Sequence, residues 1–187
     1  MRLGNFAVEI PQGKEGPSGY ITIKHNTKYT IQLINFGYPR CDAKIKIDGK
    51  SVGVWRIMSR EYDHIERPIH DTGCFTFYQF GTYEAEKAGL TQSEDLGLIS
   101  VLFKPDKERR NTRWCRFNMG NTELSRKGKL GGTGLSGKSE QKFCKAPMLN
   151  YDKTGYVQIY LRLVCEMLGG DEEPRPLPPM PPVIIVR

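Results

Sequence analysis

The residues most suggestive of chemistry are Gly132 to Ser139, which read GTGLSGKS. This run fits the pattern G-x-x-x-x-G-K-[ST], in which backbone N–H groups and a lysine hold the phosphates of a nucleotide. Such a loop works only when a buried strand leads into the glycines and a helix follows, with its N-terminus facing the phosphates. The motif therefore has to be judged by its neighbours.

The sequence around this motif does not predict a nucleotide-binding fold. Residues 121–131 are polar and basic and show no strand pattern, and Pro147 limits any following helix to about two turns. No apolar run ending in an aspartate that could hold Mg²⁺ follows downstream. We therefore predict an exposed, glycine-rich basic loop rather than a nucleotide hydrolase, although its N–H groups and Lys138 could still bind a stray phosphate.

Much of the remaining sequence predicts short β-strands. β-Branched and aromatic residues alternate with polar ones in several runs, and Gly, Pro, Asn and Asp separate these runs. The expected strands cover residues 19–24, 28–36, 62–68, 73–80, 96–105 and 155–167.

A hairpin is predicted at CDAKIKIDGKSVGVWRI, residues 41–57. Asp48-Gly49 is a strong two-residue turn signal, because both turn positions need a positive φ. Continuing the alternation through the turn places Val52 and Val54 on the apolar side and Trp55 on the opposite face.

These strands, with one short helix expected at 83–89, predict an all-β protein. Strands of this length and spacing favour an antiparallel β-sandwich or a jelly-roll-like fold. We expect an extended N-terminal segment (1–16), a β-sandwich domain (17–168) and a C-terminal arm (169–187).

The net charge of +7 is concentrated in one region. Residues 104–145 hold 12 basic and 4 acidic residues, a local charge of +8, and the rest of the chain carries −1. Arginines beside Trp114 and Phe117 could hold phosphates and stack on bases, so this basic loop region is a candidate site for nucleic acid or an acidic glycan. The alternative is a solvated basic face. The candidate residues are Arg109, Arg110, Arg113, Arg116, Lys127, Lys129 and Lys138.

The C-terminal arm is rich in proline and ends in VIIVR. Six of the nine residues from Pro174 to Pro182 are proline, which favours an extended polyproline II spacer. The apolar end needs a partner, and we favour strand addition to a neighbouring sheet edge. RPLPPMP also resembles the ligands of SH3 domains, which is the alternative. The candidate partner-binding residues are Arg175, Pro178, Pro179, Pro181, Val183, Ile184, Ile185 and Val186.

The sequence marks no catalytic, metal or cofactor site. Five widely spaced cysteines without a C-x-x-C pair favour free thiols in a reducing compartment. His64, His70 and Cys74 lie close in sequence but lack a fourth ligand at a standard spacing. The N-terminus has no apolar signal-peptide core, and no run approaches the roughly 18 apolar residues of a membrane span. We expect an intracellular or virion protein that is not an enzyme.

Several segments together resemble a β-sandwich domain of large DNA viruses of algae and protists. The similarity covers residues 17–165 and rests on RCDAKIKIDGKSVGVWRI, IERP, GCFTFYQF and GTGLSGKSEQKF. It implies a structural or virion-associated role, such as a minor capsid protein, and makes GTGLSGKS part of the domain's own pattern. The preferred hypothesis is thus an assembly protein that bridges neighbouring capsid-like subunits through its arm; the alternative is a polyanion-binding module.

Overall fold

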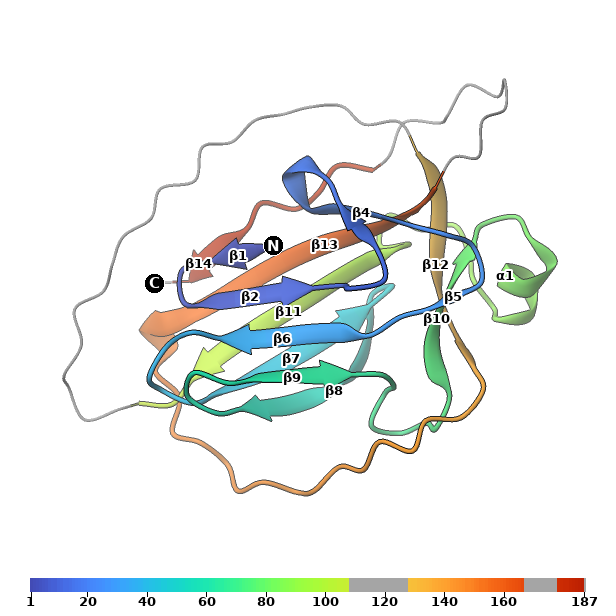
Figure 1. Ribbon diagram of the computed structural model, residues 1–187. Helices are drawn as coiled ribbons and strands as arrows, with labels where there is room; N and C mark the ends of the chain where they lie inside the picture. Colours follow the sequence, from blue (N-terminus) through green and yellow to red (C-terminus); the bar gives the residue numbers. More distant parts are fainter. Residues whose placement is uncertain (108–127, 167–177, 187) are drawn as a thin grey trace.

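The structure is a computed structural model that describes residues 1–107, 128–166 and 178–186. These residues form mostly β-strands, with a single short α-helix among them. The pairing is antiparallel except where β4 (Tyr20–Ile23) runs parallel to β13 (Tyr156–Cys165). The all-β class predicted from the sequence is confirmed (Figure 1).

The strands belong to two sheets. The smaller sheet has the order β1-β2-β6-β9. Its strands are β1 (Arg2–Leu3), β2 (Phe6–Glu9), β6 (Ile31–Asn35) and β9 (Tyr62–Ile65).

The larger sheet has ten strands, and its main order is β5-β10-β12-β13-β11-β7-β8. β4 and β14 both pair with β13, and β3 pairs with β4. The remaining strands are β3 (Lys14–Glu15), β5 (Thr27–Lys28), β7 (Cys41–Ile47), β8 (Lys50–Ile57), β10 (Cys74–Gln79), β11 (Leu98–Pro105), β12 (Lys129–Ser136) and β14 (Ile184–Val186).

The hydrophobic core takes side chains from both sheets. Phe6 of the smaller sheet stacks on Phe103 of the larger one, with ring centroids 4.6 Å apart. Val8 and Leu33 are fully buried in the same core. Residues 1–16, expected to lie outside the domain as an extended segment, thus supply strand β2 and part of the core.

The single helix, α1 (Tyr83–Lys87), lies where the sequence predicted it. The Thr82 hydroxyl caps its N-terminus by accepting a hydrogen bond from the Ala85 N–H. Gly89 follows its C-terminus with a φ of +69°, a conformation that glycine adopts without a steric penalty.

The hairpin of β7 and β8 is confirmed, but the predicted position of Trp55 is wrong. Asp48 and Gly49 form the turn with φ values of +50° and +76°. The register of the two strands then shifts by one residue. Lys46 pairs with Ser51 and Ile45 pairs with Gly53, so Val52 has no direct partner on β7. This extra residue reverses the alternation, so Trp55 is buried and Val54 is exposed.

Candidate functional site

The phosphate-loop-like motif lies mainly in a strand, which corrects the predicted loop. Gly132 to Ser136 belong to β12, which pairs antiparallel with β10 from Cys74↔Ser136 to Gln79↔Gly131. Only Gly137 to Ser139 follow the strand, and Gly137 has a φ of +64°. Antiparallel pairing to a neighbouring strand occupies backbone N–H groups that a phosphate loop would direct at its ligand.

Large neighbouring side chains explain the glycines of β12. A Cβ at Gly131 would lie 2.2 Å from the Phe77 ring, and one at Gly134 would lie 2.6 Å from the Tyr78 ring. A Cβ at Gly132 would lie 2.5 Å from Leu96. The glycines therefore let other elements pack directly against the strand.

The serine of the motif makes a structural contact, and its lysine faces solvent. Lys138 is exposed and lies 4.0 Å from the Glu140 carboxylate. Ser139 is buried, and its hydroxyl donates a hydrogen bond of 2.8 Å to Glu66. Residues 137–150, which we call the strap, continue without helix. The arrangement thus lacks the helix N-terminus on which phosphate binding depends.

The strap runs along the side of the molecule near β8 and β9 (Figure 1). The Gln141 side chain accepts a hydrogen bond from the Glu66 N–H and donates one to the His64 carbonyl. Phe143 packs edge-on against Trp55, with ring centroids 5.8 Å apart, and the Arg67 guanidinium lies over the Phe143 ring. The basic strap is therefore attached to the domain by specific contacts.

Asp48 connects the hairpin turn to two other parts of the larger sheet. Its carboxylate accepts hydrogen bonds from the Gly97 N–H at 2.6 Å and the Thr133 N–H at 2.8 Å. Burial raises the pKa of Asp48 to about 6, because desolvation outweighs the two hydrogen bonds and the nearby charges of Lys50 and Arg162. These contacts give this perturbed carboxyl group a structural role.

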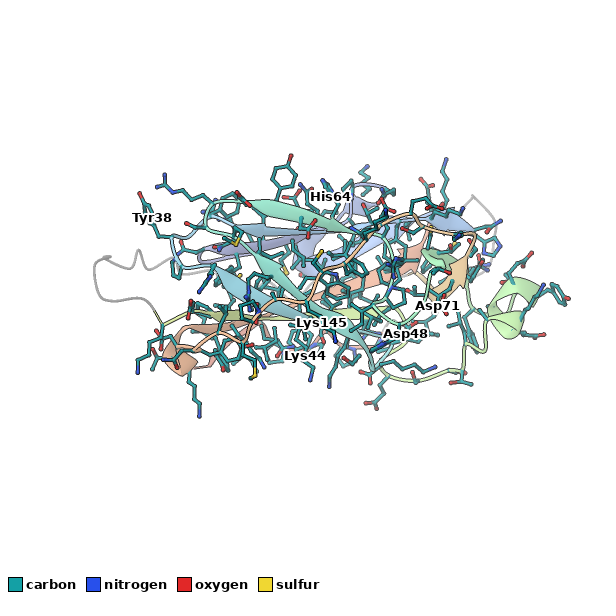
Figure 2. All side chains as sticks on the ribbon, turned by 90° about the horizontal axis from the view of Figure 1, so that it is seen from below. Tyr38, Lys44, Asp48, His64, Asp71 and Lys145 are labelled. Atoms are coloured by element: carbon teal, nitrogen blue, oxygen red, sulfur yellow. The ribbon has the colours of Figure 1, made fainter. Side chains whose placement is uncertain are left out.

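The outer face of the larger sheet has a shallow hollow of about 420 Å³. It is lined by polar side chains and two leucines, Leu98 and Leu102, from β7, β11 and β13, and by one residue of the C-terminal arm. Within the described ranges, neither Lys44 nor Lys46 has a carboxylate within 4.0 Å, although Asp95 also lines the hollow. Figure 2 shows Lys44, on β7 of the larger sheet, and His64, on β9 of the smaller sheet, in different layers of the molecule. The other lining residues of interest are Ser100, Gln158, Tyr160 and Pro181.

The described part of the C-terminal arm, residues 178–186, lies along the edge of β13. The Tyr20 hydroxyl donates a hydrogen bond of 3.1 Å to the Pro178 carbonyl, and Met180 lies close to Gly19. β14 then pairs antiparallel with β13. The register is Gln158↔Ile184, Val157↔Ile185 and Tyr156↔Val186.

Side chains on the arm differ in burial. Pro178, Pro181 and Val183 are half-buried, whereas Pro179 is exposed. Ile184 and Ile185 are 45% and 53% exposed. The strand therefore occupies an edge of the sheet without bringing its apolar side chains fully into the core.

The structure places some of the predicted site residues and not others. Lys129 begins β12, and Lys138 lies on the strap. The remaining predicted candidates lie outside the described residues, namely Arg109, Arg110, Arg113, Arg116, Lys127 and Arg175.

Neither the hollow nor the role of Tyr20 was predicted from the sequence. The alternation of Lys44 and Lys46 with buried isoleucines was the only sequence signal of the hollow. The hollow forms when β7, β11 and β13 lie side by side, and their order in the sheet cannot be read from that alternation. The contact between Tyr20 and Pro178 joins residues 158 positions apart.

The part of the chain that the structure describes contains no group of three or more His, Cys, Asp or Glu side chains placed to hold a metal ion. The helix in this part is too short to cross a membrane. Against known proteins, no family model, no curated protein and no solved structure matches this chain.

Proposed function

We propose that this chain is a non-enzymatic structural protein that assembles with other protein subunits through its C-terminal arm. The observation that carries the proposal is the terminal strand β14, which pairs at a sheet edge while Ile184 and Ile185 stay about half exposed. An extended apolar segment that adds to a sheet edge is a recurrent mode of protein recognition. The same backbone pairing can be made with a neighbouring subunit.

We also propose that the two sheets and their shared core form a jelly-roll-like β-sandwich, an architecture used by viral capsid domains. Together with the sequence resemblance, this favours a minor capsid or virion-associated role, in the virion or in a reducing cellular compartment. The free thiols among the described residues agree with a reducing environment; they are Cys41, Cys74, Cys144 and Cys165.

The test compares the full chain with a chain lacking residues 174–187. Both are tagged and expressed in the natural source, and the amount of each in purified high-molecular-weight complexes is measured. We expect the truncated chain to be lost from the complexes and to keep the circular dichroism spectrum of the domain. A matched control replaces Met148, which is 89% exposed and lies on the strap, with serine. Equal retention of the truncated and full chains would overturn the proposal.

A second candidate function is binding of a polyanion, and the lysines of the hollow favour it. Lys44 and Lys46 project from one strand into the hollow without a carboxylate within 4.0 Å among the described residues. Their charge adds to that of the region 104–145, and a ligand bound in this way would be released by salt. We expect Lys44→Glu with Lys46→Glu, or reversal of Arg109, Arg110 and Arg113, to weaken binding to heparin or single-stranded DNA. Unchanged binding in both variants would reject this candidate.

A further inference from the structure

The arm and the edge that receives it belong to one chain. The edge of β13 is covered by β4 along Arg162–Cys165 and by β14 along Tyr156–Gln158. Without β14, the second stretch would expose unpaired backbone groups, which makes it an acceptor for an added strand. The structure thus defines both halves of a complementary contact.

The arm is held weakly enough to be exchanged. Its strand has three paired residues, and the side chains of Ile184 and Ile185 remain about half exposed. Ahead of this strand, the Tyr20 hydroxyl holds the arm by its hydrogen bond to the Pro178 carbonyl. Since an identical copy presents the same Tyr20 and the same β13 edge, an arm from one copy would make the same contacts on another.

We propose that the partner of the arm is a second copy of this chain, whose β13 edge at Tyr156–Gln158 receives β14 by strand exchange. This inference rests on the proposed function and names its partner. The internal and exchanged forms have the same contacts, so their balance depends on concentration. A tethered arm meets its own edge at an effective concentration on the order of millimolar. Exchange is therefore favoured where copies are crowded, as in an ordered assembly.

A pair of cysteines placed on separate copies tests the exchange. Gln158 and Ile184 are direct partners in the register, so Gln158→Cys in one tagged copy can form a disulfide with Ile184→Cys in another. The two copies are unfolded and refolded together at about 1 mM, the order of the effective concentration, and then oxidised. We expect a disulfide-linked heterodimer. The background removes three native cysteines by change to serine: Cys74, Cys115 and Cys144.

The matched control carries Lys46→Cys in place of Gln158→Cys. Lys46 lines the same hollow but lies on β7, two strands from β13, so it should give no heterodimer. A chain with both Gln158→Cys and Ile184→Cys distinguishes a failure of exchange between copies from a failure of the arm to dock on β13. If it closes an internal disulfide while the mixed copies form none, exchange between copies is overturned and the assembly function stands. If neither disulfide forms, the arm does not dock on β13 and both proposals fail.

A shortened chain gives an independent measurement. Gln158 lies eight residues, or roughly 26 Å, from Glu166, and β4 covers the edge between them along Arg162–Cys165. Deleting residues 168–177 leaves eight residue steps from Glu166 to Ile184, about 25 Å at the rise of polyproline II, so the arm cannot pass β4 and reach its own edge. We expect the molecular mass in solution to double, and to return to that of a monomer when residues 178–187 are also removed. A monomeric deletion variant would contradict the exchange.

Discussion

β12 and the C-terminal arm are both conspicuous in the sequence, but the structure attaches them to the domain very differently. β12 pairs with six residues of β10, and its glycines lie against the rings of Phe77 and Tyr78. β14 pairs with three residues of β13 and leaves two isoleucines about half exposed. A motif that resembles a catalytic loop can thus be required by packing, whereas the loosely held strand is the better candidate for interaction.

The largest expected effect on stability comes from a substitution in β12. Gly131→Ala would place a Cβ 2.2 Å from the fully buried Phe77 ring and 2.6 Å from the Tyr78 carbonyl oxygen. Because neither atom belongs to a flexible surface side chain, we expect the free energy of unfolding to fall by about 3 kcal/mol or more. Urea denaturation followed by tryptophan fluorescence measures it.

Two control variants separate this steric clash from backbone strain and from phosphate binding. Gly81→Ala meets no atom within 4 Å but has a φ of +83°, so it should lower stability by only about 1 kcal/mol through backbone strain. Lys138→Ala removes the lysine that a phosphate loop would need and should change stability by less than about 0.5 kcal/mol. A nucleotide affinity in the parent chain that Lys138→Ala abolishes would contradict a purely structural role for the motif.

The sequence predicted elements whose signals are local. Asp48-Gly49 marked the hairpin, and Gly89 marked the end of the helix, because each reflects the φ preference of nearby residues. β12 was missed because glycine disfavours strands, and its requirement for glycine comes from Phe77, Tyr78 and other residues distant in the chain. Arm docking could be foreseen as a β-prone terminus, but the identity of the acceptor depends on the order of strands in the sheet.

A pH titration tests how strongly Asp48 is bound to β12. The pKa of this carboxyl group is raised from 3.8 to about 6 in the folded protein, so the folded state binds more protons than the unfolded state between these values. Stability from this group is therefore complete below pH 3.8 and is lost as the pH rises through 6. Asp48→Asn removes the titration and tolerates the positive φ of the turn.

We expect the stability of the parent chain relative to Asp48→Asn to decrease by about 2 kcal/mol from about pH 4 to about pH 7. Chemical denaturation of both proteins at several pH values gives this difference. Other groups titrate equally in both proteins, so their contributions to the difference in the free energy of unfolding cancel. A constant difference across the range would show that the buried contact between the turn and β12 does not perturb Asp48.

A smaller effect is expected at the strap, which follows β12. Gln141→Ala removes the hydrogen bonds to the Glu66 N–H and the His64 carbonyl, so unfolding should become easier by about 1–2 kcal/mol. The neighbouring variant Lys142→Ala changes a side chain that makes neither bond and should be close to neutral. Equal melting temperatures for the two variants would show that the strap is not held by Gln141.

The smallest effect on stability is expected at the arm, although it should have the largest effect on assembly. Ile185→Ser removes one apolar side chain that is already about half exposed, so the free energy of unfolding should fall by only about 1 kcal/mol. The same change should reduce the doubled mass of the chain lacking residues 168–177, because the exchanged strand loses an apolar contact. Sedimentation and thermal melting measure the two quantities on one sample. A large loss of stability with the doubled mass intact would make β14 a structural element of its own domain and not a connector.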